Sequence, residues 1–244
     1  MPGVLEALPA GVAAIRAELA RRQLAAKRAT GVGYEVLFPA EGEYSREKYP
    51  RHLEFFAAGA QHRERVLLAA NRVGKTLAGA YEMALHTTGD YPDWWQGRRF
   101  THPVRAWACG DTSKTVRDIL QSTLVGPPHD PGLGVFPPDR ILRQTPKAGV
   151  PDAIETILVR HTSGGTSELQ LKSYDQKREA FQGTATHSVW LDEEPPEDIY
   201  TECLLRTAET STFSGGMVFC TFTPLMGMTP LILSFLETTH GQTQ

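Results

Sequence analysis

One run of residues, 66–77, constrains the fold of this chain more than any other feature. It reads VLLAANRVGKTL, so a short apolar strand leads directly into a glycine-lysine-threonine turn and then into helix-forming residues. Amide groups at the start of a helix are unpaired and lie at the positive end of the helix dipole, which makes such a turn a seat for phosphate. The run therefore predicts a phosphate-binding loop between a strand and a helix that includes 77–85.

Three residues of this loop have chemistry that suits a nucleotide. Gly74 lets the backbone approach closely, Lys75 would lie on the β- and γ-phosphates, and the hydroxyl of Thr76 would hold Mg²⁺. Ala69 occupies the position of the first glycine in the usual G-x-x-x-x-G-K-S/T pattern, so a chance strand-turn-helix is the alternative interpretation. The loop residues expected to bind nucleotide are Ala70, Asn71, Arg72, Val73, Gly74, Lys75, Thr76 and Leu77.

A second strand, within 188–192, ends in acidic residues that a phosphate site requires. Asp192 at its carboxyl end can reach the Mg²⁺ shell, and Glu193 is placed to polarise a water against the γ-phosphate. Two prolines at 195–196 end the strand abruptly. We interpret Glu194 as a solvated charge, with a role shared with Glu193 as the alternative.

A third strand, 216–220, is followed by Thr221, Phe222 and Thr223. Ligands of open α/β sheets bind at the carboxyl ends of the strands, where these hydroxyls could sense the γ-phosphate. Capping of a turn is the alternative for the threonines. Further elements are expected as a strand over 104–109, a helix that starts near 110–115 with Ser113 and Lys114 as modest DNA contacts or caps, and a hairpin formed by 154–161 and 168–174. The proline-rich stretch 126–151 is expected to be irregular, and 91–100 to pack rather than to stack on nucleic acid.

Composition indicates an intracellular α/β domain. The 244 residues carry a net charge of −3, so any contact with DNA must be a local patch. The three cysteines, Cys109, Cys203 and Cys220, are expected to be reduced core residues rather than a disulfide set or a zinc site. No secretory segment or long apolar span is apparent, which favours a soluble cytoplasmic protein. Residues 1–32 are expected to form a basic amphipathic helical arm, either solvated or a docking element.

Three segments, taken together and in this order, resemble a known family. AANRVGKT at 69–76, VWLDEE at 189–194 and TFTP at 221–224 are similar to the ATPase domain of the large terminase subunit of tailed bacteriophages, the motor that pumps DNA into a procapsid. The resemblance extends from about residue 49 to 224. It implies a P-loop NTPase fold of the ASCE type, an α/β fold with a mostly parallel central sheet flanked by helices, plus a β-hairpin excursion.

The resemblance also implies roles for particular residues. Arg72 would contact the γ-phosphate region, Asp192 would bind metal and Glu193 would activate water. The segment from Thr221 to Thr223 would couple hydrolysis to domain movement. Tyr49, Pro50 and His52 would cradle the adenine.

A trans-acting arginine finger is not matched directly, because the arginine-glycine expected before the acidic strand is replaced by Phe181-Gln182-Gly183. Arg178 is the leading candidate and Arg206 the second. For each of them a surface arginine or a local ion pair is the alternative.

The family implies partners as well. These are ATP with Mg²⁺, double-stranded DNA, the portal protein of the procapsid and the small terminase subunit, in the cytoplasm of the infected host cell and without a membrane. A homo-oligomeric ring, a pentamer, is expected on the portal, and a monomer in solution. Residues 33–244 would form the ATPase domain, and the nuclease domain that normally follows is not expected in this chain, so no nuclease activity is expected. Two other functions stay open: another P-loop nucleic-acid translocase or helicase, and a non-hydrolysing nucleotide-binding switch.

Overall fold

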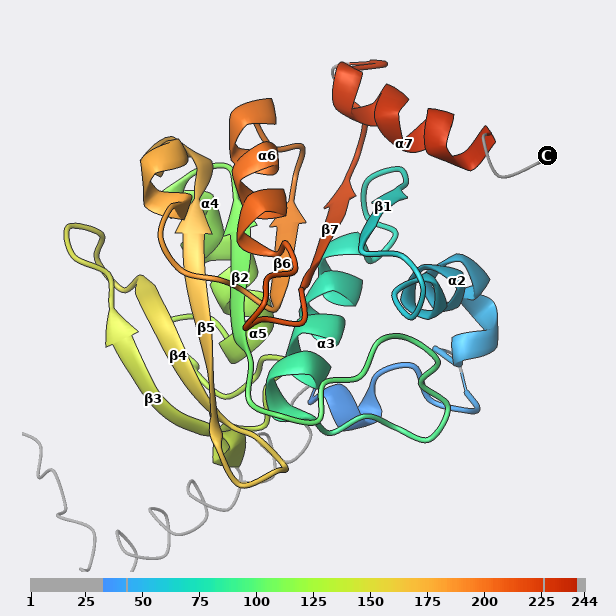
Figure 1. Cartoon of the computed structure of the whole chain (residues 1–244). Coiled ribbons are helices and arrows are strands. Elements are labelled where there is room, and N and C mark those ends of the chain that lie inside the picture. The colour runs from blue at the N-terminus through green and yellow to red at the C-terminus, as the bar shows by residue number, and fades with distance from the viewer. Residues whose placement is uncertain (1–32, 43, 226, 241–244) are drawn as a thin grey trace, which may run out of the picture.

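The fold is built on one seven-stranded sheet, as the computed structural model of residues 33–42, 44–225 and 227–240 shows (Figure 1). The predicted arm over 1–32 lies outside the described residues. The strand order is β1-β7-β6-β2-β5-β4-β3, in which the first five strands are parallel, β4 pairs antiparallel to β5, and β3 pairs antiparallel to β4. The predicted mostly parallel sheet with a hairpin is therefore confirmed. The strands are β1 Glu64–Leu68, β2 Arg105–Gly110, β3 Ile141–Pro146, β4 Ile154–Arg160, β5 Thr166–Ser173, β6 Ser188–Asp192 and β7 Met217–Phe222.

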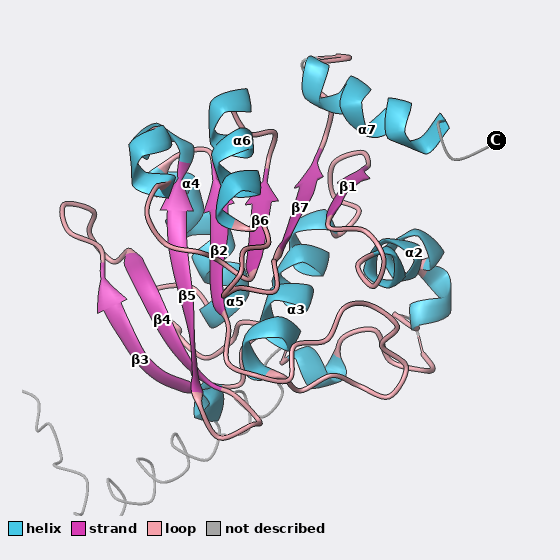
Figure 2. Cartoon of the chain, in the orientation of Figure 1, coloured by secondary structure: helices cyan, strands magenta, loops and turns pink. Residues whose placement is uncertain are grey.

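Helices cover both faces of the parallel part of the sheet (Figure 2). On one face, α3 and the η3–α5 segment pack in a cluster with Ala106, Trp190 and Phe219. On the other face, α6 and η6 pack in a second cluster with Trp107 and Val189. The helices are η1 Tyr34–Val36, η2 Arg46–Lys48, α2 Pro50–Ala58, α3 Lys75–Thr88, α4 Ser113–Thr115, the π-helical η3 Val116–Gln121, α5 Ser122–Val125, η4 Pro138–Arg140, η5 Tyr174–Gln176, η6 Arg178–Phe181, α6 Glu197–Arg206 and α7 Pro230–His240.

The burial of each strand follows its place in the sheet. All residues of β6 and β7 are buried, as expected for central parallel strands with helices on both faces. In β5, buried residues alternate with more exposed ones, because one of its faces is not covered by a helix of the described chain. The apolar runs at 188–192 and 217–222 therefore correspond to the buried central strands β6 and β7.

Close packing fixes the helix that follows the phosphate loop against the acidic strand. Gly79 of α3 faces the indole of Trp190 on β6, and a Cβ at this position would lie 2.3 Å from the ring. Both Gly79 and Trp190 are buried. Because no other residue could stand there without moving the indole, the glycine sets how closely α3 approaches the sheet.

Two sequence predictions concerning the core are confirmed. Trp95 of the 91–100 segment is buried and packs against Phe56 and Tyr81, with ring centroids 5.0 and 6.2 Å apart. The aromatic pair therefore serves packing. All three cysteines are free and buried, and burial raises their thiol pKa values, which keeps the thiols protonated.

The prediction that 126–151 is irregular was wrong for its second half. Residues 138–140 form η4, and Ile141–Pro146 form β3, which pairs with β4 across two register shifts. Most of the residues of β3 are exposed, so this edge strand lacks the alternating apolar pattern by which a strand is found in a sequence.

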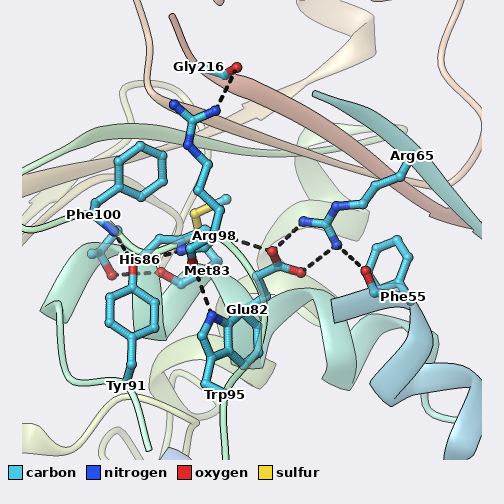
Figure 3. A network of polar contacts seen from close by, with 11 residues as sticks. Phe55, Arg65, Glu82, Met83, His86, Tyr91, Trp95, Arg98, Phe100 and Gly216 are labelled. Carbon is cyan, nitrogen blue, oxygen red and sulfur yellow. Dashed lines mark hydrogen bonds and ion pairs between the residues drawn. The ribbon is translucent and has the colours of Figure 1, made fainter. Parts of the chain in front are cut away.

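A buried polar network ties α2, β1 and α3 together (Figure 3). Arg65 of β1 donates to both carboxylate oxygens of Glu82 on α3, and its Nη1 also donates to the carbonyl of Phe55 at 2.9 Å. Nε2 of His86 lies 3.0 Å from Glu82 Oε1, and Nδ1 lies 2.9 Å from the hydroxyl of Tyr91. Burial by itself raises the pKa of Glu82, but the charge of Arg65 and the bonds to His86 outweigh it and lower that pKa.

In the part of the chain that the structure describes, no helix is long and apolar enough to cross a bilayer.

The network predicts a large loss of stability when one of its charges is removed. Glu82→Ala leaves Arg65 buried without its carboxylate, which should lower the free energy of unfolding by about 3–5 kcal/mol. Glu54→Ala is the matched control, because its ion pair with Arg51 is exposed and should contribute about 1 kcal/mol at most. Urea unfolding of both variants measures the difference, and equal losses would contradict the role assigned to Glu82.

Candidate active site

The three motifs of the sequence meet at one edge of the sheet. The phosphate loop follows β1, the acidic turn follows β6, and β7 lies between these two strands. In the register of the sheet, Leu68 is opposite Phe222, and Asp192 is opposite Thr221. The carboxyl ends of the three strands are therefore neighbours, as the α/β fold requires for a ligand site.

Lys75 lies inside the phosphate loop. Its Nζ donates to the carbonyl oxygens of Ala69 at 3.0 Å and Ala70 at 2.7 Å, and to the hydroxyl of Thr223 at 2.8 Å. Burial lowers the pKa of Lys75, while the charges of Glu193 and Asp192 act in the opposite direction. The ammonium is thus held by neutral acceptors and lies within range of the charges of Asp192 and Glu193. A phosphate oxygen could replace one of the carbonyl acceptors.

Two residues of the loop have left-handed backbone conformations. Gly74 has φ 84°, and Arg72 has φ 64°, which is uncommon for a residue with a side chain. The side chain of Arg72 is exposed and makes no hydrogen bond or ion pair with the described residues. Backbone strain of this kind is typical of functional loops, and here it turns an unpaired guanidinium outward beside Lys75.

Asp192 joins the acidic strand to the phosphate-loop helix. The hydroxyl of Thr76 lies 3.1 and 3.2 Å from the two carboxylate oxygens, and the hydroxyl of Thr221 donates to Oδ1 at 2.7 Å. Nε1 of Trp190 in turn donates to the Thr221 hydroxyl at 2.7 Å. Asp192 is only 3% exposed, and burial raises its pKa to about 7. Burial outweighs the charge of Lys75, which acts to lower this pKa, so a further cation at this position would stabilise the ionised carboxylate.

Glu193 has a different environment from Asp192, although it is the next residue. It is exposed, its φ is 67°, and its amide donates to the carbonyl of Thr221 at 3.1 Å. The left-handed conformation takes the chain out of the strand, so that one acid is enclosed and the other faces solvent. The sequence predicted a metal-binding role for Asp192 and a water-polarising role for Glu193, and the structure gives the two acids different environments.

The interpretation of Glu194 as a solvated charge was wrong. Its side chain is half-buried and accepts a hydrogen bond from the hydroxyl of Thr229, which also accepts the amide of Ile232 at 3.3 Å in the first turn of α7. Glu194 therefore fastens α7 to the acidic turn. The sequence spacing of 35 residues between the partners gave no signal of this contact.

The predicted coupling segment divides into two kinds of residue. Thr221 and Phe222 belong to β7 rather than to the turn after it, and Phe222 is fully buried in the core. Thr223 lies over the phosphate loop, where its hydroxyl is 3.0 Å from the carbonyl of Ala69 and 2.8 Å from Oδ1 of Asn71. The two threonines thus contact opposite sides of the site, Asp192 and Lys75.

A cavity of about 840 Å³ lies beside the phosphate loop. Tyr49, Pro50 and His52, the residues predicted to cradle a base, line it at the start of α2. Burial lowers the pKa of His52, which favours a neutral ring. Val73, also predicted to bind nucleotide, lines the cavity as well, together with Leu67 and Leu68 of β1. Sequence reasoning missed Phe235 and Leu236, because α7 is distant in the chain from the phosphate loop.

Both candidate arginine fingers are engaged within the chain. Arg178 Nε lies 2.9 Å from Glu202 Oε2, and Arg206 Nε lies 3.0 Å from Glu202 Oε1. Glu202 of α6 is 2% exposed, while the side chain of Arg178 is 47% exposed. In the single chain, each arginine therefore has the local ion pair that was its alternative interpretation.

The modest DNA-contact candidates have structural partners too. The amide of Ser113 donates to Asp175 at 3.1 Å, and its hydroxyl lies 2.9 Å from that of Ser173. Thr112 caps α4 in a capping box with Thr115. Ser113, the first residue of the helix, is therefore held by Asp175 and Ser173, and Lys114 is the neighbouring residue of the same short helix.

Comparisons with known proteins bear on this site. The family model described as "Terminase large subunit, T4likevirus-type, N-terminal" matches residues 66–242. The terminase large subunit of Salmonella phage P22 is 36% identical over 214 residues, which are 80% of this chain and 42% of that protein. The chain therefore spans less than half the length of this curated relative.

Solved structures share the fold. The large terminase of bacteriophage HK97 matches with a TM-score of 0.55 at 13% identity, over 90% of this chain and 41% of that one. The large terminase of the thermophilic bacteriophage D6E, in complex with ADP, matches with a TM-score of 0.51 at 13% identity, over 80% of this chain and 43% of that one.

The pKa of Asp192 predicts how the stability of the metal-free chain depends on pH. Because the folded-state pKa of about 7 exceeds the ordinary value of 3.8, the folded chain binds the extra proton between these values. Stability should fall as the pH rises through this window, by up to about 4 kcal/mol. Asp192→Asn should remove most of this fall. Urea unfolding at about pH 5 and pH 8 measures the upper part of this fall, roughly 2–3 kcal/mol, and an equal fall in both proteins would refute the assignment to Asp192.

Proposed function

This chain belongs to the terminase large-subunit family of T4-like-virus type, and we propose that it is an ATP-hydrolysing motor domain that drives double-stranded DNA into a procapsid. One observation carries the proposal. The Thr76 hydroxyl of the phosphate-loop helix lies 3.1 Å from the carboxylate of Asp192, at the end of the acidic strand. A hydroxyl and a carboxylate at this separation, beside a lysine in a phosphate loop, are the protein groups that P-loop NTPases use around a nucleotide triphosphate.

The site suits Mg²⁺ as the cofactor. Magnesium prefers oxygen ligands and is usually bound by one or two protein groups together with substrate phosphates and waters. Thr76 and Asp192 would provide those two groups, and burial raises the pKa of Asp192 despite the charge of Lys75, so a further cation would stabilise its carboxylate. When bound, the ion would neutralise charge that develops on the β- and γ-phosphates.

In the proposed reaction, the chain positions ATP and an attacking water. Lys75 would leave the loop carbonyls and donate to the β- and γ-phosphates, and the unpaired guanidinium of Arg72 would turn toward the γ-phosphate. The exposed carboxylate of Glu193 would accept a hydrogen bond from the water and orient it for in-line attack. The bond between the γ-phosphorus and the bridging oxygen breaks, the water oxygen bonds to the γ-phosphorus, and a proton of the water passes to Glu193 and then to solvent as ADP and phosphate leave.

Thr223 is proposed to link the presence or loss of the γ-phosphate to the position of the end of β7. Its hydroxyl accepts from Lys75 and contacts the loop at Ala69. A phosphate that draws Lys75 away would break the first contact, and its departure would restore it. Because Thr221 and Thr223 belong to one strand end, a shift at either threonine displaces the same backbone.

The base would occupy the cavity next to the loop. This cavity is lined by Tyr49, Pro50 and His52 and by Val73 of the phosphate loop, a largely apolar set of side chains that continues from the loop. The two carboxylates of Asp192 and Glu193 mark the other end of the nucleotide.

The partners are proposed from the family. They are double-stranded DNA, the portal of the procapsid and the small terminase subunit, with a homo-oligomeric ring, a pentamer, assembled on the portal in the host cytoplasm. In such a ring, Arg178 would serve as the trans-acting finger after exchange of its bond with Glu202, with Arg206 as the second candidate. The lack of nuclease activity in this chain stays a prediction.

Replacing the carboxylate of Glu193 by a neutral amide should affect ATP hydrolysis but not ATP binding. Glu193→Gln should keep ATP affinity and lower turnover by roughly 100-fold or more, because an amide cannot accept the proton of the water. Glu194→Gln is the matched control, since Glu194 bonds to Thr229 and should leave turnover intact. Phosphate release with and without DNA measures both. Full turnover by Glu193→Gln would remove the residue from the mechanism.

Removal of the loop ammonium should affect binding first. Lys75→Ala should weaken ATP binding roughly tenfold to 100-fold, because charge-assisted hydrogen bonds to phosphate are lost. Lys114→Ala, on a different strand-to-helix turn, is the control and should bind as the unchanged chain does. Titration with a fluorescent ATP analogue tests the pair, and unaltered affinity of Lys75→Ala would exclude it from the phosphate site.

A further inference from the structure

Tyr174 has a contact with the acidic turn that no sequence motif announces. It is the first residue of η5, directly after β5, and is 6% exposed. Its hydroxyl donates to the backbone carbonyl of Asp192 at 3.1 Å and to that of Glu193 at 3.0 Å. One phenolic proton is therefore shared between the two peptide groups on either side of the Glu193 Cα atom.

The ring of Tyr174 is fixed from both sides. It belongs to the buried cluster that contains Trp107, Cys109 and Leu191. The η5 turn is closed by a capping box between Ser173 and Gln176. The donor thus has a fixed position.

Glu193 needs such a support because its backbone is strained. A left-handed φ of 67° is uncommon for a residue other than glycine, asparagine or aspartate, and it persists only where surrounding contacts enforce it. The amide of Glu193 is held by the carbonyl of Thr221 at 3.1 Å, and its carbonyl is held by Tyr174. Both peptide groups that flank the strained Cα therefore have a partner on a neighbouring segment.

The conformation of Glu193 decides where its carboxylate lies. In an extended strand, successive side chains point to opposite faces, which would carry Glu193 away from the side of Asp192. The left-handed turn instead leaves Glu193 exposed and close enough to Lys75 for its charge to affect the pKa of the ammonium. The φ angle of Glu193 therefore decides whether its carboxylate can approach the phosphate-binding loop.

We propose that Tyr174 is a positioning residue for the hydrolytic reaction, which holds the Asp192–Glu193 peptide so that Glu193 faces the attacking water. The assignment rests on the proposed ATPase function. Tyr174 contacts no nucleotide and acts through the backbone of Glu193. It belongs to the segment that also carries Arg178, so the acid and the candidate finger have a common support.

Tyr174→Phe tests the proposal, because it removes only the hydroxyl and keeps the buried ring. The matched control is Tyr200→Phe on α6. Tyr200 is also buried, but its hydroxyl donates to Glu64 at 2.9 Å, at the amino end of β1 and away from the acidic turn. Tyr174→Phe loses a hydrogen bond shared between two carbonyls, Tyr200→Phe loses one to a carboxylate, and both should show small decreases in Tm.

The two variants should differ in catalysis. Tyr174→Phe should lower kcat roughly fivefold to tenfold, the equivalent of one net hydrogen bond, while the affinity for a non-hydrolysable ATP analogue stays within about twofold of the unchanged chain. Tyr200→Phe should retain kcat. If Tyr174 had only a structural role, Tyr174→Phe would lower Tm without lowering kcat selectively over nucleotide affinity. Equal kcat values in all three proteins would overturn the assignment.

A crystal structure of Tyr174→Phe gives a readout that does not depend on turnover. Glu193 should leave the left-handed region or its carboxylate should turn from the side of Lys75. An unchanged φ with the carboxylate in place would overturn the proposal even if the unchanged chain hydrolyses no ATP. An inactive unchanged chain with a displaced Glu193 in the variant would instead count against the proposed function and leave the positioning contact established.

Discussion

The buried carboxylate of Asp192 is the group on which the rest of the site depends. It is enclosed by Thr76 of the phosphate-loop helix and Thr221 of β7, and Trp190 extends the chain of hydrogen bonds back into β6. A carboxylate with a pKa of about 7 is costly to keep ionised at neutral pH without a cation. The fold thus holds open a position whose electrostatics a metal-nucleotide complex would satisfy. The charges of Lys75 and Glu193 both act on Asp192. Lys75 is held by loop carbonyls, and Glu193 is exposed by a strained turn.

The frame around this position is built from contacts that cross the sheet. Gly79 lets α3 approach Trp190, which sets the distance between the phosphate-loop helix and the acidic strand. Farther along α3, Glu82 binds Arg65 of β1, and Arg65 holds the carbonyl of Phe55 on the helix that begins with the residues of the base cavity. The phosphate seat and the base cavity are therefore joined through a buried ion pair. Such a pair contributes mainly to the uniqueness of the arrangement, because desolvation offsets much of its Coulomb energy.

The sequence predicted those parts of the fold and site that depend on local pattern. The strand, the turn with its glycine and the following helix give the phosphate loop, and the apolar strands give the parallel sheet, because both signals lie within a short stretch of chain. It did not predict β3, whose exposed edge position needs no apolar pattern. It also misread Glu194, whose partner Thr229 is 35 residues away. The pairing of Arg178 and Arg206 with one buried Glu202 was among the alternatives, but only the packing of η6 on α6 brings the three groups together.

Sequence alone determined which chemical groups are available and at which strand ends they stand: a lysine and a threonine after one strand, two acids after another, and two threonines on a third. Strand order, burial and backbone conformation were decided by the tertiary structure. Insertion of β7 between β1 and β6 brings the three strand ends together. Burial encloses Asp192 while its neighbour Glu193 is exposed, and the hydroxyl of Tyr174 reaches the turn from η5, which follows β5. The physical reason is that solvation and hydrogen bonding depend on neighbours in space, which a linear pattern does not specify.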